Sequence, residues 1–141
     1  MGKETSQSGP TQAVIKRLFA RSGNCCAFPR CKMPIVHEAT IVGEICHIKA
    51  ARPGGARFDP NQSAQDRHGF DNLILLCANH HTIVDDDPEA YTVARLVKMK
   101  AEHEARSVVI SDEQASHSAA LLIKQTVQSV NQSGGIYGAY G

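Results

Sequence analysis

The sequence contains no tryptophan, and aromatic residues make up only 5% of its 141 positions. So few aromatic side chains predict a modest hydrophobic core, and small domains with such cores often need a metal ion or another cross-link. No apolar run approaches the roughly 18 residues of a membrane-spanning helix. Residues 1–10 are polar and lack the apolar centre of a signal peptide. We therefore expect a cytoplasmic protein.

The five cysteines are an odd number, which does not suit a framework of disulfide bonds. Such cysteines are typical of metal ligands in a reducing compartment. No Cys-x-x-Cys motif occurs, so a redox role for the adjacent Cys25 and Cys26 is a weaker alternative. Internal repeats are absent as well. The remaining composition, with 42% hydrophobic and 21% charged residues, is ordinary for one globular domain with tails.

The net charge of +1 conceals an uneven distribution. Residues 13–58 contain eight lysines and arginines, and their only acidic residues are Glu38 and Glu44. Residues 59–141 contain six basic and eleven acidic residues. A basic half suits a polyanionic partner, although the whole chain is less basic than a typical stand-alone nucleic-acid binder. A mixed, solvated surface accounts for the same counts.

Composition and turn residues divide the chain into three parts. Residues 1–12 are a polar tail that we expect to be disordered, and residues 13–106 are expected to form one α+β domain. Residues 107–141 hold a linker, an amphipathic helix and a Gly-rich end. Residues 108–110 are expected to form a short strand, and the helix to begin with a capping box at Ser111. The apolar face of that helix could pack on the domain, form a homodimer or lead toward a further module.

Periodicity in the first half of the domain predicts one helix and two strands. Apolar spacing over residues 13–20 indicates the helix. Residues 40–48 are rich in β-branched side chains, and the continuous apolar run 73–76 predicts a buried strand. The intervening residues 49–71 are expected to form a 23-residue loop, and structureless loops of this length are uncommon unless they are functional.

The second half of the domain is expected to hold two helices. The first follows Cys77 and reaches about Val84. The second has Asp87 as its N-cap and Pro88 as its first residue, and it runs to Arg106. Its buried side is expected to carry Leu96, Val97 and Met99.

Two pairs of potential ligands are spaced for one structural metal ion. Cys26 and Cys31 lie in one turn-rich segment, and Cys77 and His80 lie together further along the chain. Thiolate and imidazole ligands favour zinc over magnesium, and four of them give the closed tetrahedral site of a structural zinc ion. Cys25 could replace Cys26, but we favour Cys26 and assign Cys25 to packing. The alternative is that these are buried, reduced cysteines.

A second group of residues has the chemistry to hydrolyse a phosphodiester. The reaction needs a base, a cation for the developing charge and a group that orients the base. His47 ends the first strand and can be the base, since imidazole titrates near neutrality. His81 and Asp85 are four residues apart on one helical face and can bind a divalent ion. Asn72 opens the second strand, where its amide can hold the surrounding loop or His47.

These residues resemble the HNH endonuclease family, whose core is a ββα-metal (His-Me) finger. His47, Asn72 and His81 look like its three signature residues, and the match covers residues 26–104. The similar motifs are Gly-Glu-Ile-Cys-His-Ile, Asp-Asn-Leu-Ile-Leu-Leu-Cys, His-His and Lys-x-x-His-Glu. The resemblance implies cleavage of nucleic acid, usually DNA, with magnesium, manganese or another divalent ion, leaving 5′ phosphate and 3′ hydroxyl ends.

The resemblance also assigns roles. It makes His47 the general base, Asn72 the orienting residue and His81 the main ligand of the catalytic ion, with Asp85 as a further ligand. A structural zinc site just before the last signature histidine is similar to that of other members. Such modules occur in bacterial restriction, mobile elements and antiphage defence, often fused to a sensor or recognition domain, so we expect DNA and such a domain as partners.

One position departs from the family pattern. The residue before the base histidine is commonly Asp or His and binds the catalytic ion, but here it is Cys46. A thiolate is a poor ligand for magnesium and a better one for softer ions such as nickel or zinc. Cys46 could be a ligand or simply buried. Glu44 lies on the same strand face and could assist, through water.

Three basic residues near the base are candidates for phosphate contacts. Arg57 could clamp a phosphate, and Lys49 and Arg52 follow His47 closely. Ordinary solvated charges are the alternative for each of them. The rival to a nuclease is a non-catalytic, zinc-stabilised module that binds nucleic acid or protein and has lost the catalytic ion through the change at Cys46.

Overall fold

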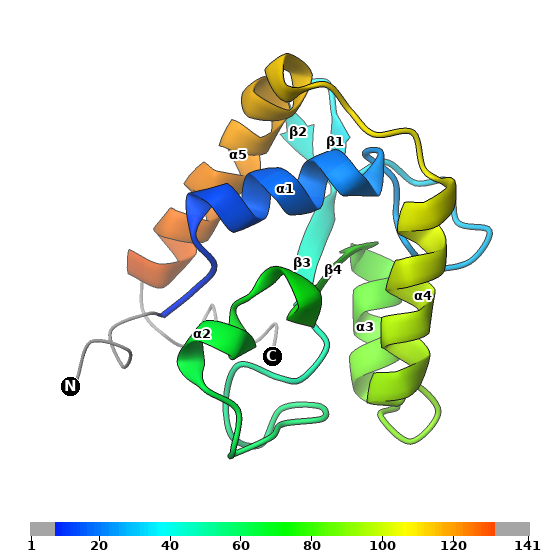
Figure 1. The fold of residues 1–141 in the computed structure, drawn as a ribbon, viewed down its shortest axis with the longest axis vertical. Helices are drawn as coiled ribbons and strands as arrows, with labels where there is room; N and C mark the ends of the chain where they lie inside the picture. Colours follow the sequence, from blue (N-terminus) through cyan, green and yellow to red (C-terminus); the bar gives the residue numbers. More distant parts are fainter. Residues whose placement is uncertain (1–7, 132–141) are drawn as a thin grey trace.

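The structure, a computed structural model, describes residues 8–131, without the side chains of residues 112 and 127–131. Over this range helices surround two short antiparallel strand pairs, so the predicted α+β class is confirmed (Figure 1). In chain order the elements are α1 (Gln12–Ser22), β1 (Val36–His37), β2 (Thr40–Ile41), β3 (Gly43–His47), α2 (Ala64–Arg67), the 3-10 helix η2 (Phe70–Asn72), β4 (Leu73–Cys77), α3 (Ala78–Asp86), α4 (Val93–Arg106) and α5 (Asp112–Asn131). Predictions for residues 1–7 and for the Gly-rich end lie outside the described residues.

The strands β3 and β4 form the pair on which the candidate site is built. They run antiparallel, with Gly43 opposite Cys77 and His47 opposite Leu73. All five residues of β4 are buried, as its apolar run predicts. Gly43 is needed here because a Cβ atom at this position would lie 2.6 Å from Ile35 Cδ1. α3 follows β4 directly, so two antiparallel strands lead into one helix.

The prediction of a structureless loop over residues 49–71 is wrong. α2 lies within it, and the Ser63 hydroxyl caps α2 by accepting a hydrogen bond of 3.0 Å from the Asp66 amide. The 3-10 helix η2 follows. Asn72 therefore ends η2 instead of opening the strand, which begins at Leu73. Two prolines and three glycines interrupt residues 49–71 and conceal the short capped helix in this sequence.

The predicted start of α4 is also wrong. Asp87 and Pro88 form only a turn, in which the Asp87 carbonyl accepts a hydrogen bond of 2.9 Å from the Tyr91 amide. The helix begins at Val93, with Thr92 as its N-cap. Side chains explain the interruption: the Tyr91 carbonyl accepts from Arg57 and the Ala90 carbonyl from Arg95. These carbonyls are therefore turned away from a continuous helix.

The buried face of α4 agrees only in part with the expected one. Leu96 and Met99 are buried as predicted, but Val97 is 48% exposed. Lys100 and His103 complete the buried stripe, which follows the helical spacing of three and four residues. After α4, residues 108–110 do not form the predicted strand. Val108 is 83% exposed there, and Ile110 only donates its amide to the Ala20 carbonyl.

The helix α5 packs against α1, and the two helices lie next to each other in Figure 1. Their contact forms an apolar core cluster with buried residues Ile15, Leu18, Phe19, Ala115, Ala119 and Leu122. The Ser111 hydroxyl accepts from the Gln114 amide at 3.3 Å, which is one half of the predicted capping box. Of the three alternatives for the apolar face of α5, packing on the domain accounts for its described residues.

A second apolar cluster joins β3, β4, α3 and α4. Its largest buried members are Ile48, Ile74, Leu76, Val84, Leu96 and Met99, and Cys26, Cys46 and Cys77 lie among them. Three of the five cysteines are thus placed in an apolar interior beside the candidate site. Within residues 8–131, no helix is both long enough and apolar enough to cross a membrane.

Candidate functional site

Four side chains from two distant segments form the first cluster: Cys26, Cys31, Cys77 and His80. Their sulfur and nitrogen donor atoms all lie within 4.8 Å of one another. His80 Nδ1 lies 3.3 Å from Cys77 Sγ and 3.7 Å from Cys26 Sγ. Three sulfurs and one imidazole at such separations fit closed tetrahedral coordination. The predicted cluster is therefore present and could hold a metal ion such as zinc.

Local contacts hold the donors of this first cluster in place. Phe28 stacks on the His80 ring, with centroids 3.9 Å apart and an angle of 2° between the planes. Burial raises the pKa of the Cys26 thiol to about 12, and a bound cation would offset this effect because the thiolate is the ligand form. Cys25 Sγ points elsewhere and donates to the Cys31 carbonyl. Cys26, and not Cys25, belongs to the cluster, as we expected from the sequence.

A second cluster is formed by Cys46 on β3 with His81 and Asp85 on α3, and their donor atoms also lie within 4.8 Å of one another. His81 Nε2 lies 3.0 Å from Asp85 Oδ2, which reflects their spacing of one helical turn. Cys46 is fully buried, and its Sγ lies 3.8 Å from Asp85 Oδ1. The structure thus brings Cys46 to the two residues that helical spacing pairs.

Glu44 orients His81 within this second cluster. Glu44 Oε1 lies 2.7 Å from His81 Nδ1, so the carboxylate can accept the Nδ1 proton and direct Nε2 toward Asp85. Burial opposes a charged imidazole, but hydrogen bonds to Asp85, Cys46 and Glu44 raise the pKa of His81 to about 12. A metal ion at His81 Nε2 would have to displace this proton, because imidazole binds metal through an unprotonated nitrogen.

Arg57 does not extend toward solvent as a phosphate clamp would. Its side chain is only 4% exposed, and its φ of 61° lies in the left-handed region. The guanidinium donates to the carbonyls of Ile48, Val84 and Tyr91 and to Asp85 Oδ1. Against the effect of burial, hydrogen bonds from His81 and Arg57 hold the pKa of Asp85 below its usual value. Arg57 therefore braces the second cluster from inside the protein.

His47 stands at the end of β3, immediately after Cys46. It is buried, and its Nε2 lies 3.0 Å from Nδ1 of His68, which is buried as well. Burial and then the neighbouring His68 lower the pKa of His47 to about 3. Burial also lowers the pKa of His68. Both rings are therefore neutral near pH 7, and one must donate the shared proton while the other accepts it.

Asn72 holds the chain that follows His47. Its Oδ1 accepts from the Lys49 amide at 2.9 Å, and its Nδ2 donates to the Lys49 carbonyl at 3.0 Å and the Arg67 carbonyl at 2.8 Å. The Ile48 amide also donates to the Asn72 backbone carbonyl. The side-chain amide thus fastens the loop beyond β3 to the segment before β4. Of the two targets expected for Asn72, its hydrogen bonds reach the loop.

The remaining charged candidates have varied surroundings. Lys49 Nζ forms an ion pair with Asp59 at 3.1 Å, and both side chains are about one-third exposed. Arg52 is exposed in the same loop. The Nε2 atom of the buried His103 lies 2.8 Å from the Ser22 carbonyl oxygen. Among the described residues, the Lys49 side chain is seen paired with Asp59 and not with either Cys/His cluster.

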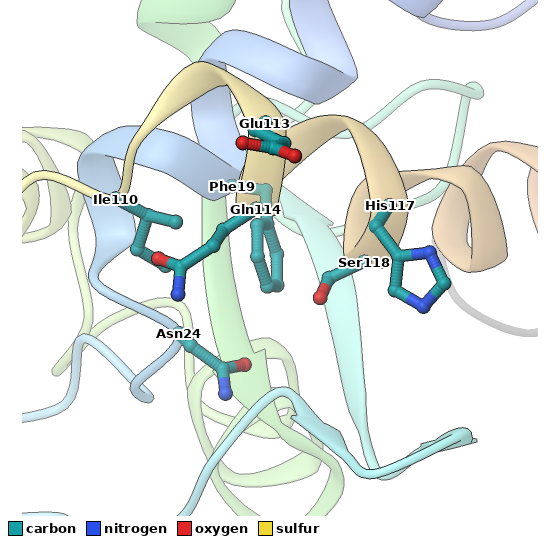
Figure 2. Close-up of a pocket in the computed structure, with 7 residues that line it drawn as sticks. All are labelled: Phe19, Asn24, Ile110, Glu113, Gln114, His117 and Ser118. Atoms are coloured by element: carbon teal, nitrogen blue, oxygen red, sulfur yellow. The ribbon is translucent and has the colours of Figure 1, made fainter.

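His68 is the residue of this site that sequence reasoning missed. It lies directly after the short helix α2, in a long segment without periodicity. Nothing in that sequence indicates that its side chain contacts His47. A cavity of about 650 Å³ lies elsewhere, between α1 and the start of α5. Figure 2 shows the Phe19 ring there between Gln114 and Ser118, and none of the cluster residues lines the cavity.

No protein-family model matches this chain, and no curated protein is significantly similar to it.

Proposed function

We propose that this protein is a metal-dependent endonuclease of the HNH type that hydrolyses phosphodiester bonds in DNA. The observation that carries the proposal is the position of His47 at the end of β3. It directly follows Cys46, which forms a cluster with His81 and Asp85 of α3. A base beside a cation site is the combination that phosphodiester hydrolysis needs. Two antiparallel strands leading into the helix that carries His81 and Asp85 are also what a ββα-metal finger would require.

The donor set of the second cluster fits a divalent ion held by His81 and Asp85, with Cys46 as a third neighbour. When bound, such an ion would supply positive charge to the scissile phosphate and to the leaving oxygen. A thiol in this set favours softer ions, so nickel, zinc and manganese belong in the assay beside magnesium. Glu44 keeps the His81 ring in place and acts through that ring.

His47 acts as the base in this proposal. Its Nδ1 lone pair accepts a proton from water while the water oxygen forms a bond to phosphorus and the bond from phosphorus to the 3′ oxygen breaks. The leaving oxygen takes a proton from solvent, so the products are a 5′ phosphate and a 3′ hydroxyl. Nδ1 can accept only if the ring proton is on Nε2. We therefore assign that proton to the hydrogen bond with His68 Nδ1.

Asn72 and the first cluster support this arrangement from two sides. Asn72 holds the loop after His47 and thereby limits how far the base can move. A zinc ion in the first cluster would fasten Cys77 and His80 at the start of α3, directly before His81. A role in bacterial restriction or antiphage defence, together with a sensor domain, remains part of the proposal through the family resemblance.

Plasmid nicking tests the proposal. Purified protein that retains its bound zinc is incubated with supercoiled DNA and magnesium, manganese, nickel or added zinc. We expect the wild type to nick with at least one ion and His47→Ala to lose about 100-fold or more in rate, as expected for loss of a general base. His37→Ala is the matched control, because His37 is an exposed histidine on β1. If the wild type nicks with none of these ions, the nuclease proposal fails and the rival non-catalytic module is favoured.

A further inference from the structure

A separate cavity of about 310 Å³ lies against the first cluster. Its walls come from the segment between α1 and β1 and from the C-terminal end of α4, which lie side by side in Figure 1. Cys26 and Cys31 of the cluster form part of its lining, together with the neighbouring Cys25. The cavity is therefore built on the same segment that would bind zinc.

The charge of this cavity is one-sided. Arg30, Lys32 and Arg106 line it, and none of the residues lining it is acidic. All three cations are exposed, and no ion pair found in residues 8–131 includes any of them. Arg106 donates one guanidinium hydrogen bond to the Glu102 carbonyl. The three positive charges thus remain available to a ligand from solvent.

The zinc site itself does not account for all of this positive charge. A divalent ion with three thiolates and one neutral imidazole carries one net negative charge. Three cations around it leave an excess of two positive charges in the cavity. Such an excess attracts an anion, and arginine and lysine bind phosphate oxygens through charge-assisted hydrogen bonds.

We propose that Arg30, Lys32 and Arg106 form a subsite for a backbone phosphate of the nucleic acid, flanking the one that is cut. This inference rests on the proposed nuclease function. α3 links the two places, because His80 of the first cluster and His81 of the second are consecutive residues. A strand seated across both would be held by phosphate contacts that position it without reading its sequence. The subsite explains why the basic half of the chain includes the segment around the zinc ligands.

Binding of DNA in the absence of cleavage tests the subsite. In a His47→Ala background, the affinity for a short fluorescent duplex is measured by anisotropy over a range of salt concentrations. We expect Arg30→Gln/Lys32→Gln to weaken binding about tenfold and to lower the slope of log affinity against log salt by about one, as expected when one phosphate is no longer neutralised. Arg106→Gln alone should lower the slope in the same direction by less than about one.

Lys98→Gln/Lys124→Gln is the matched control, since it removes two exposed positive charges on α4 and α5 away from this cavity. Equal affinities of the two double variants would overturn the proposal, because a general loss of charge would then explain both. Loss of zinc from Arg30→Gln/Lys32→Gln would also overturn it, since the cations would then serve the zinc ligands. If the wild type binds free thymidine monophosphate and this variant does not, the cavity is a mononucleotide pocket and not a subsite for the nucleic-acid backbone. A wild type that binds DNA through this cavity and never nicks it would refute only the catalytic proposal.

Discussion

The hydrogen bond between His47 and His68 joins two neutral imidazole rings that are 21 residues apart in the chain. Only one direction of this bond leaves His47 competent as a base at Nδ1, namely the one in which its Nε2–H donates. In the proposed reaction His68 would be a positioning residue, since it contacts His47 and would act through that ring. The identity of the side chain at position 68 should therefore affect turnover.

Replacement of His68 tests this role. We expect His68→Leu to lower kcat for nicking about tenfold to hundredfold with little change in KM, because the base ring loses its partner while the substrate contacts remain. In His68→Asn the amide oxygen can stand near the position of Nδ1, and much of kcat should return. Equal rates in the leucine and asparagine variants, with both proteins folded by circular dichroism, would show that the hydrogen bond does not position the base.

Arg57 gives a second prediction at this scale. Arg57→Met removes the donors to three backbone carbonyls and the ion pair to Asp85. Breaking a buried ion pair on one side costs about 3–5 kcal/mol, because the remaining groups stay buried without partners. We expect a loss of this size in urea unfolding. Lys98→Met, at a side chain that is 75% exposed, should change the stability by less than about 0.5 kcal/mol.

Residues differ in how well the sequence reveals their roles. His81 and Asp85 are paired by helical spacing alone, and the structure brings them to 3.0 Å. The burial of Arg57 is not visible in the sequence, because an arginine in a loop is normally solvated and nothing local indicates the four acceptors around it. His68 could not be assigned because its partner His47 is reached only through the path of the loop and α2.

At the level of elements, the segment around Cys26 and Cys31 combines apolar packing with a cluster that could hold a metal ion. It contains no regular helix or strand between α1 and β1, so a bound ion would supply much of its order. We expect Cys31→Ser to lose zinc and to melt at a clearly lower temperature. Cys25→Ser should keep both the zinc content and the melting temperature, since Cys25 lies outside the cluster.

Zinc content by mass spectrometry and thermal melting measure the two effects. His81→Ala belongs in the same series, because it should leave the zinc content unchanged if the two clusters are separate. Full zinc in Cys31→Ser would contradict the assignment of the first cluster. Zinc loss in His81→Ala would contradict the separation of the two sites.

Elements with strong local signals could be predicted, and those decided by distant side chains could not. α1 ends as its Ser-Gly-Asn sequence indicates, since Gly23 adopts a φ of 65°. β4 follows from four consecutive apolar residues. The sequence pattern predicts too early a start for α4, because it does not show that Arg57 and Arg95 donate hydrogen bonds to the carbonyls of Tyr91 and Ala90. The strand β1 has two residues, too few for any periodicity.

At the level of the whole molecule, α5 belongs to the same packed unit as the rest of the chain. Its buried residues share one core cluster with α1, although the composition of residues 107–141 indicates a linker and an appended helix. Leu122→Ala should therefore destabilise the protein by about 2–4 kcal/mol in urea unfolding, because it leaves a cavity against α1.

A single unfolding transition is expected for both the wild type and Leu122→Ala. Lys124→Ala, at an exposed position two residues further along α5, is the control and should be near neutral. An unchanged stability in Leu122→Ala would mean that α5 can leave the domain at little cost. The division of the chain predicted from composition would then describe it better than the shared core does.

Cys77 is the last residue of β4, the strand partner of Gly43 and a member of the first cluster. Two chain loops therefore meet at this residue. Strand pairing closes the loop from Gly43 to Cys77, and a bound metal ion would close the loop from Cys31 to Cys77. Once the strands have paired, the loop that separates Cys31 from Cys77 is shortened roughly fourfold. Each halving of the loop length lowers the free-energy cost of closing it by about 0.6 kcal/mol. Folding of the strand pair would thus favour binding of an ion by the first cluster, and an ion bound early would favour strand pairing in return.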